Sequence, residues 1–205
     1  MPPSSRSAVI FDLGGVLIDW NPRHLYCKLF AGDEAGMERF LSTVCTQHWN
    51  EQQDAGRSFA EATALLCAEH PGKADLIRAY FARWPEMLGG AIDGTVAIMT
   101  ELRRRDVPLY ALSNWSAETF PHGLRRFDFL HWFRDRVVSG DVGLIKPDPR
   151  IYRLLLERNG LAASDAVYID DVKRNADAAT ALGLHGIHFT DPAALRRELE
   201  ALGLL

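Results

Sequence analysis

The feature that most constrains the fold is a short apolar run that recurs along the chain and mostly ends in polar groups. The first run, residues 7–13, reads SAVIFDL and is followed by Gly14-Gly15, which indicates a buried strand and a tight turn. Further strands of this kind are predicted at 107–112, 136–139, 166–169 and 186–189. The polar pairs that follow three of these runs are Ser113-Asn114, Asp170-Asp171 and Thr190-Asp191.

Helical patterns lie between these runs. Apolar residues have helical spacing in 95–105 and in 151–158, where Gly160 follows as a C-cap. Residues 175–182 are rich in Ala, and Asp191-Pro192 fits an N-cap followed by the first helical position. Short strands that alternate with helices indicate a parallel sheet with helices on both faces. We therefore predict an α/β chain with a three-layer core.

Residues 20–90 break this alternation. They contain helical patterns, with a capping box from Ser58 to Glu61, and no convincing strand. We expect Gly89-Gly90 to form a flexible end of the segment. The chain is therefore divided into a core, residues 1–19 and 91–205, and a helical insertion, residues 20–90.

Composition and charge narrow the class of protein. The 205 residues are 47% hydrophobic and 24% charged, which is typical of a globular chain. The net charge is -4 and Lys and Arg are scattered, so we expect no nucleic-acid partner. The N-terminus lacks the apolar core of a signal peptide, and no apolar run approaches the about 20 residues that cross a bilayer. We expect a cytoplasmic protein without a membrane partner, and the sequence carries no signal for an oligomeric state.

Polar groups gather at one predicted edge of the sheet. In open parallel sheets, ligands bind beyond the carboxyl ends of the strands. The side chains expected there are Asp12, Ser113, Asn114, Lys146, Asp170 and Asp171. Any one of these groups can simply cap a helix or hold a turn. Their coincidence at a single edge favours a functional site.

The residue types fit phosphoryl transfer. Carboxylates that converge repel each other and stay ionised when they share a hard cation, and oxygen ligands suit Mg²⁺. Such a cation lets Asp12 approach an anionic phosphate as a nucleophile. Lys146, Ser113 and Asn114 can hold the nucleophile and phosphate oxygens, and the glycine turn after Asp12 lets backbone N–H groups approach the phosphate. The pattern predicts a metal-assisted hydrolase.

These residues make the sequence similar to the haloacid dehalogenase superfamily of hydrolases, over nearly the whole chain and in the family's motif order. Motif one is matched by FDLGGVLID, with Asp12 as nucleophile, and motif two by ALSNWS, through Ser113. Motif three is matched by IKPDPRIY, through Lys146, and motif four by YIDDVKRNADAATALG, through Asp170 and Asp171. The resemblance implies a Rossmann-like core with a small helical cap after the first strand. It also implies two steps, in which Asp12 attacks and water hydrolyses the aspartyl intermediate.

One position departs from the pattern of the family's phosphatases. They usually carry a second Asp two residues after the nucleophile, which protonates the leaving group and then activates water, whereas this chain has Gly14. The Gly14 carbonyl can still bind Mg²⁺, but the general acid/base, typically worth about 10²–10⁴ in rate, is missing. Glycine also occurs here in a similar sugar-phosphate branch, around alpha-glucose 1-phosphate phosphatase. Candidates for a substitute acid in the cap are His24, His48 and Asp54.

Three functions stay open. The first is a Mg²⁺-dependent phosphatase of a small phosphorylated metabolite, with a sugar phosphate as one candidate. The second is a 2-haloacid dehalogenase, which also lacks the second Asp and needs no divalent metal. Dehalogenases offer small polar groups at the place of Asp170-Asp171 and usually a bulky aromatic at the place of Gly14, so this chain resembles them less. The third is a non-catalytic ligand-binding member of the family, which only Gly14 supports.

Residues outside the motifs add candidates for the substrate pocket. Caps of this family face the nucleophile, so we expect Trp20 and His48 to contact the substrate. The alternative is that these side chains only pack in the core or lie on the surface. Trp115 can wall the pocket, and Asn175 can orient the metal carboxylates. The predicted catalytic groups are Asp12, Ser113 and Lys146; the metal ligands are Asp12, Gly14, Asp170 and Asp171; and the substrate contacts are Gly14, Gly15, Ser113, Asn114, Lys146, Trp20 and His48.

Overall fold

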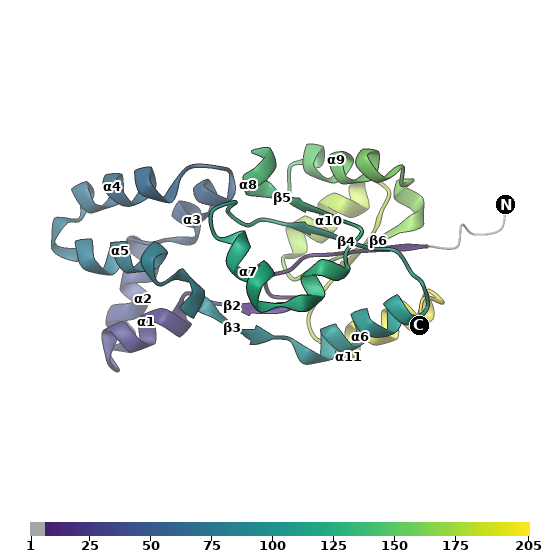
Figure 1. Cartoon of the computed structure of the whole chain (residues 1–205), viewed down its shortest axis with the longest axis horizontal. Coiled ribbons are helices and arrows are strands. Elements are labelled where there is room, and N and C mark those ends of the chain that lie inside the picture. The colour runs from purple at the N-terminus through teal and green to yellow at the C-terminus, as the bar shows by residue number, and fades with distance from the viewer. Residues whose placement is uncertain (1–6) are drawn as a thin grey trace.

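Among residues 7–205, which the computed structural model describes, five parallel strands form the central sheet of the molecule (Figure 1). The strands are β1 (Ala8–Phe11), β4 (Leu109–Ser113), β5 (Asp135–Val138), β6 (Ala166–Asp170) and β7 (His185–His188). Their order is β5-β4-β1-β6-β7. The chain moves outward from β1 first to one side and later to the other, so the carboxyl end of β1 is a topological switch point.

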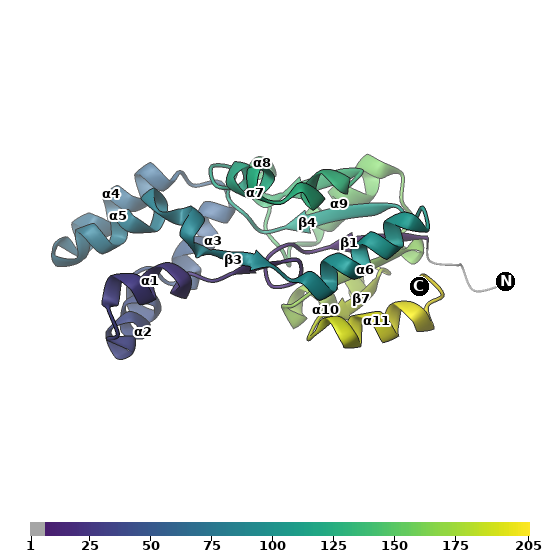
Figure 2. The same cartoon turned by 60° about the horizontal axis from the view of Figure 1, so that its bottom comes forward.

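Helices cover both faces of this sheet (Figure 2). Along β1, Val9 and Phe11 join one apolar cluster, whereas Ala8 and Ile10 join another. Successive strand residues point to opposite faces, so β1 is buried on both sides. The first cluster includes residues of α6 (Asp93–Arg104) and α11 (Pro192–Ala201), and the second includes residues of α9 (Pro149–Asn159) and α10 (Lys173–Ala181). The predicted three-layer, Rossmann-like α/β fold is confirmed.

Short helices complete the core. They lie on the connections between β4 and β6. Their bounds are α7 (Phe120–Arg126), η3 (Asp128–Trp132), α8 (Ser139–Val142) and η4 (Ala163–Asp165), where η marks a 3₁₀ helix.

A helical cap follows the first strand, as predicted. It extends from a two-stranded antiparallel ribbon, β2 (Ile18–Trp20) and β3 (Leu88–Ala91). Tyr80 lies at its centre, with ring centroids 5.0 Å from Trp49 and 6.2 Å from both Tyr26 and Phe59. The helices of residues 20–90 are α1 (Arg23–Phe30), α2 (Glu34–Thr43), α3 (Gln47–Asp54), α4 (Phe59–Glu69), η1 (Pro71–Lys73), α5 (Ala74–Ala82) and η2 (Trp84–Met87).

Local sequence explains several helix ends. Asp191 accepts a backbone hydrogen bond in the first turn of α11, and Pro192 is its first residue. Gly160 ends α9 in the left-handed region, at a φ of 60°. Ser58 accepts a hydrogen bond from the N–H of Glu61 at the start of α4. The predicted strands and helices of the core are all present, with bounds that move by about two residues at most.

The predictions for the two ends of the cap segment were wrong. No strand was predicted there, yet β2 ends at Trp20 and β3 contains Gly89-Gly90, which are therefore strand residues rather than a flexible end. A Cβ atom at Gly89 would lie 2.2 Å from Oδ2 of Asp19, so the Asp19 side chain packs over this glycine. β2 has only three residues, and two of the four residues of β3 are glycine, so neither strand carries an alternation that a sequence can show. The division into domains at residues 20 and 90 stays a prediction.

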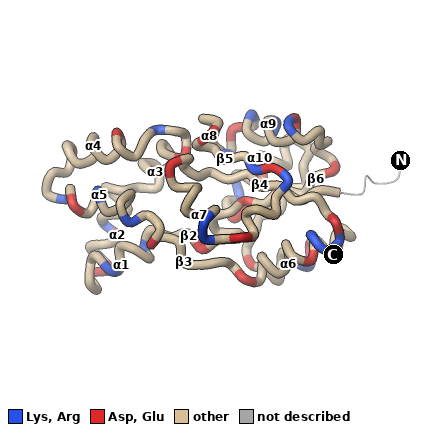
Figure 3. The backbone as a smooth tube through the Cα atoms, in the orientation of Figure 1, with Lys and Arg blue, Asp and Glu red and all other residues tan. Residues whose placement is uncertain are grey.

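Charged residues of both signs are interspersed over the core and the cap (Figure 3). No helix among residues 7–205 is long and apolar enough to cross a membrane. Residues 1–6, which belong to the predicted core and to the N-terminus inspected for a signal peptide, lie outside the described residues.

Candidate active site

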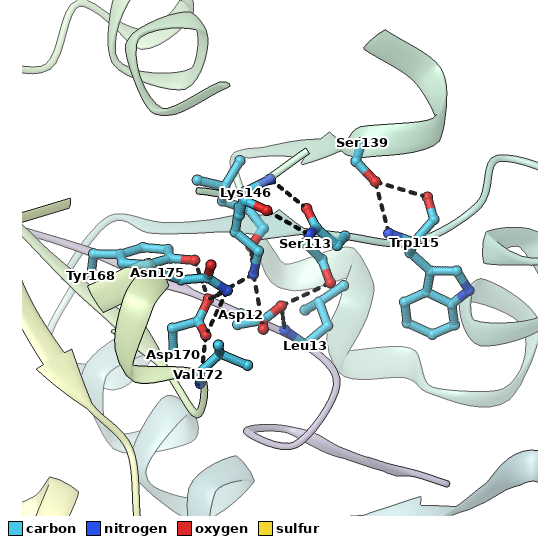
Figure 4. Close-up of polar contacts among 12 residues, drawn as sticks. Asp12, Leu13, Ser113, Trp115, Ser139, Lys146, Tyr168, Asp170, Val172 and Asn175 are labelled. Atoms are coloured by element: carbon cyan, nitrogen blue, oxygen red, sulfur yellow. Dashed lines mark hydrogen bonds and ion pairs between the residues drawn. The ribbon is translucent and has the colours of Figure 1, made fainter. Parts of the chain in front are cut away.

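The carboxyl ends of three neighbouring strands bring the predicted residues to one edge of the sheet (Figure 4). The register sets the residue before Asp12 opposite Ala111 of β4 and Ile169 of β6. Asp12 therefore follows β1 at the level where Ser113 ends β4 and Asp170 ends β6. The strand order, rather than any local sequence rule, makes these distant residues neighbours.

Three donors hold the carboxylate of Asp12. Ser113 Oγ donates to Asp12 Oδ1 over 2.8 Å, and the N–H of Leu13 donates to the same oxygen over 2.7 Å. Lys146 Nζ lies 2.9 Å from Asp12 Oδ2. Asp12 is only 7% exposed, so these contacts fix its orientation, as a nucleophile requires.

Lys146 is a buried cation shared by two carboxylates. Its Nζ donates to Asp170 Oδ2 over 2.7 Å and to the Leu112 carbonyl over 3.1 Å, in addition to its ion pair with Asp12. Burial alone would lower the pKa of the ammonium group, but the charges of Asp12 and Asp170 outweigh burial and raise that pKa. Lys146 is therefore a charged clamp rather than a proton donor.

Asn114 positions Lys146. The N–H of Lys146 donates to Asn114 Oδ1 over 2.8 Å, and Asn114 Nδ2 donates to the Lys146 carbonyl over 3.2 Å. Both ends of the amide are thus occupied. The Asn114 side chain thus fixes the loop that presents the lysine, and Asn114 also lines the cavity over the site. Its contact with phosphate oxygens stays a prediction.

Asp170 is buried behind this clamp. It accepts hydrogen bonds from Tyr168 Oη, from the N–H of Val172 over 2.8 Å and from Asn175 Nδ2 over 3.1 Å. Burial, followed by the charge of Asp170, raises the pKa of Tyr168 well above its usual value, so the phenol stays a donor. Asn175 orients Asp170, as the sequence suggested.

Asp171 is the more exposed acid and lies against Gly15. Gly15 has a φ of 73°, in the left-handed region. A Cβ atom there would also lie 2.3 Å from Asp171 Oδ2. Both its backbone conformation and the approach of the carboxylate therefore require glycine at this position.

Asp12, Asp170 and Asp171 form a group that fits a metal ion. Each offers one carboxylate oxygen, and these oxygens lie within 4.8 Å of one another. Burial raises the pKa of Asp12 to about 7; Lys146 opposes the shift, and Asp170 and Asp171 add to it. Burial and then Asp170 also raise the pKa of Asp171. One lysine does not balance three carboxylates, so the donor set fits a hard cation such as Mg²⁺.

A buried acceptor lies beside this acidic group. Oδ1 of Asn175 has no hydrogen-bond partner among the described residues, although its Nδ2 is occupied by Asp170. A buried polar atom without a partner is costly. A water molecule held by a cation at the three acids would give this oxygen a donor, which is a second reason that the group fits a metal.

A cavity of about 380 Å³ opens over these side chains and is lined by both the core and the cap. Trp84 and Trp115, whose ring centroids are 5.5 Å apart, supply part of its apolar wall. The predicted site residues that line it are Asp12, Gly14, Gly15, Trp20, Ser113, Asn114, Lys146 and Asp171.

His48 does not line this cavity, contrary to our prediction of a substrate contact. One face of α3 does, through Gln47, Asn50, Glu51 and Asp54. His48 lies off that face, and its side chain is 84% exposed. His24, another candidate acid, instead pairs with Asp19 at 2.9 Å and is absent from the lining.

Sequence reasoning missed part of the wall. The residues not foreseen include Gln47, Glu51, Trp84 and Arg174. Arg174 of α10 and Glu51 of α3 form an ion pair of 3.1 Å. The sequence did carry a signal for part of this wall: residues 47, 50, 51 and 54 are polar and have the spacing of a single helix face.

Known proteins match this chain over most of its length. A family model described as haloacid dehalogenase-like hydrolase matches residues 7–183. The chain is 30% identical over 220 residues to acyl-CoA dehydrogenase family member 10 of Mus musculus, a match that covers 97% of this chain and only 19% of that protein. It is 28% identical to the sesquiterpene phosphatase astK of Aspergillus oryzae, over 95% of each protein.

Solved structures share the fold. The HAD family enzyme bt-2542 from Bacteroides thetaiotaomicron, in a magnesium complex, has a TM-score of 0.69 and 24% identity over 91% of this chain and 94% of its own. A protein described as a dehalogenase has a TM-score of 0.63 and 21% identity over 88% of this chain and 83% of its own. These identities show the fold alone. The family model, which spans most of the chain and all four motifs, shows that this protein belongs to the haloacid dehalogenase-like hydrolases.

Proposed function

We propose that this hydrolase is a Mg²⁺-dependent phosphatase of small phosphate monoesters that forms an aspartyl phosphate on Asp12. The observation that carries the proposal is the convergence of the carboxylates of Asp12, Asp170 and Asp171 beside the cavity, with Lys146 paired to the first two. The relative named as a sesquiterpene phosphatase, which matches over 95% of its length, supports the same reaction class.

The residues of the site have separate roles in such a reaction. Lys146 and Ser113 hold the Asp12 carboxylate while it attacks the phosphorus and the ester oxygen departs. Water then attacks the aspartyl phosphate, which releases phosphate and restores the carboxylate. Mg²⁺, held by Asp12, Asp170, Asp171 and the Gly14 carbonyl, would supply the positive charge that lets a carboxylate approach an anionic phosphate. The turn at Gly14 and Gly15 leaves room for phosphate beside the backbone.

The cavity indicates the class of ester. Its volume of about 380 Å³ suits a compact organic group. Trp20, Trp84 and Trp115 offer aromatic surface, on which a sugar ring or an apolar group can pack, and Gln47 offers a polar amide. Sugar phosphates are therefore the first class to test. Apolar phosphates are the second, because of the relative named as a sesquiterpene phosphatase.

A 2-haloacid dehalogenase is the second candidate, supported by the lack of a second Asp at position 14 and by the fold shared with the protein described as a dehalogenase. That reaction expels a halide from a monoanionic substrate and needs no cation. It gives no reason for two adjacent acids at the end of β6. A non-catalytic binding domain likewise gives no reason to retain Asp12 and Lys146 in contact. The cytoplasmic location and the lack of nucleic-acid and membrane partners stay predictions.

A panel of sugar, nucleoside and prenyl phosphates tests the proposal, with 4-nitrophenyl phosphate as a general substrate. We expect phosphate release that requires Mg²⁺ and is abolished by EDTA and by Asp12→Asn. Phosphate release that survives EDTA would remove the metal from the mechanism, and activity retained by Asp12→Asn would remove the nucleophile. Halide release from 2-chloropropionate without any phosphatase activity would select the dehalogenase instead.

A further inference from the structure

The proposed chemistry lacks a proton donor at the position where the sequence has Gly14. An alkyl ester oxygen leaves as a poor alkoxide unless it receives a proton as its bond to phosphorus breaks. The second step needs a base that takes a proton from the attacking water. The donor must face the cavity, because the leaving group lies on the open side of the phosphate, away from Asp12.

The described residues offer a short list of ionisable groups on the cavity wall: Asp12, Glu51, Asp54, Lys146, Asp171 and Arg174. Asp12 and Asp171 belong to the carboxylate cluster, and Lys146 is committed to two ion pairs. Arg174 does not release its proton. Glu51 is already engaged in an ion pair with Arg174 at 3.1 Å. Asp54 is the remaining acid.

The position of Asp54 is fixed from two sides. Within the cap, Asn50 Nδ2 donates to Asp54 Oδ2 over 2.9 Å, and Tyr80 Oη donates to Asn50 Oδ1 over 3.0 Å. From the core, Ser139 Oγ donates to the Asp54 carbonyl over 2.6 Å. Asp54 is only 7% exposed although it lines the cavity. It thus reaches the cavity as a preoriented group that bulk water barely touches.

We propose that Asp54 is the general acid and general base that the core of this enzyme lacks, a role that rests on the phosphatase function proposed above. In the first step, Asp12 forms a bond to phosphorus, the bond from phosphorus to the ester oxygen breaks, and the proton of Asp54 moves to that oxygen. In the second step, the Asp54 carboxylate takes a proton from water as the water oxygen attacks phosphorus. The bond to Asp12 breaks, and Asp54 is protonated again, ready for the next turnover.

The electrostatic surroundings suit both halves of this cycle. Burial raises the pKa of Asp54 to about 7, and the charges of Glu51 and Asp12 add to the effect. The backbone N–H of Ser116 and the charge of Lys146 act in the opposite direction. Near neutral pH such a carboxyl group is present in both forms, which is the condition for an acid that later serves as a base.

The test compares leaving groups in Asp54→Asn, which keeps the size of the side chain. For an alkyl phosphate such as glycerol phosphate, kcat/KM should fall by about 10²–10⁴-fold. For 2,4-dinitrophenyl phosphate, whose leaving group needs no proton, kcat/KM should change little. With that substrate the variant should show a burst of dinitrophenolate and then slow turnover, because hydrolysis of the aspartyl phosphate lacks its base.

Two further variants keep the test specific. Glu51→Gln removes a carboxylate from the same helix face, and its leaving-group dependence should match that of the wild type, whatever happens to KM. Gly14→Asp, placed in the Asp54→Asn background, should restore turnover of the alkyl phosphate. A Cβ atom at Gly14 would meet nothing closer than the Cβ of Trp20 at 4.0 Å, so the backbone there leaves room for a side chain to begin.

One measurement needs no variant. The wild-type kcat/KM for the alkyl phosphate should fall as pH rises through the ionisation of Asp54, whereas that for dinitrophenyl phosphate should not. Three results would each overturn the role of Asp54 and leave the phosphatase function standing. They are an equal loss of kcat/KM on all substrates in Asp54→Asn, an unchanged leaving-group dependence in that variant, and identical pH profiles for the two substrates. A wild-type protein that hydrolyses no phosphate ester, with or without Mg²⁺, would overturn both.

Discussion

The core side and the cap side of the cavity position their residues in different ways. On the core side, Asp12, Ser113 and Asp170 stand at the ends of adjacent strands, and the register of the sheet sets their spacing. On the cap side, one face of α3 supplies the wall, and Asp54 reaches its place through the contacts of Asn50. The core thus carries a rigid charge network, whereas the cap carries groups whose positions depend on how two bodies meet. Each prediction below tests a part of this contrast.

The largest effect is expected at the centre of the core network. Lys146→Met leaves Asp12 and Asp170 buried without their cation. Removing one partner of a buried ion pair typically costs about 3–5 kcal/mol, so the free energy of unfolding in urea at neutral pH should fall by that amount. Activity should be lost with it, because Asp12 loses its clamp.

The matched control is Lys173→Met. Lys173 pairs with Asp177 at 2.7 Å, but these side chains are 68% and 61% exposed. An exposed pair is worth about 0–1 kcal/mol, so this variant should unfold near the wild-type midpoint. Equal losses in the two lysine variants would mean that burial of the charge network is not what stabilises the core side.

The second prediction concerns pH and Asp54 on the cap side. Its pKa is raised from 3.8 to about 7, so the folded protein keeps a proton that the unfolded chain has already released. Stability therefore falls as pH rises from about 4 to about 7. Asp54→Asn cannot titrate, so over this window its free energy of unfolding should fall less than that of the wild type, by about 4 kcal/mol at most.

Urea unfolding of both proteins at several pH values measures this difference. Asp12 and Asp171 also have raised pKa values, but both proteins contain them, so their contribution cancels in the comparison. Parallel stability curves would show that the Asp54 carboxyl group is not desolvated by the closed cap.

The same contrast explains what the sequence could predict. Asp12, Ser113 and Asp170 were predictable because apolar runs mark the strands, and parallel strands present their carboxyl ends at one edge. The ribbon of β2 and β3 was not, because both strands are short and β3 is rich in glycine. His48 was misplaced because residue type and region say nothing about which face of a helix meets the core. Asp54 stood among three candidates until the contacts of α3 separated it from the others.

The third prediction compares two adjacent glycines on the core side. Gly15→Ala places a side chain in the left-handed region and against Asp171, so it should cost about 1–3 kcal/mol and weaken Mg²⁺-dependent turnover. The Cβ atom of Gly14→Ala would meet only the Cβ of Trp20, at 4.0 Å, so this variant should change stability by about 0.5 kcal/mol at most. Thermal unfolding and a Mg²⁺ titration of activity separate the two. Similar losses at both positions would contradict the close approach of Asp171.

The smallest effect is expected at the ion pair that joins the two sides. The ion pair of Arg174 and Glu51 has a length of 3.1 Å, and the two side chains are 62% and 23% exposed. Arg174→Ala should therefore lower the free energy of unfolding by only about 0–1 kcal/mol, and by less at high salt. A double-mutant cycle with Glu51→Gln measures their coupling. The control is Arg78→Ala, which removes an exposed pair with Asp75 inside the cap. Of these two pairs, only that of Arg174 and Glu51 bridges core and cap at the cavity. KM should therefore rise in Arg174→Ala and stay constant in Arg78→Ala. Equal KM values would mean that this bridge plays no part in holding the cap over the substrate.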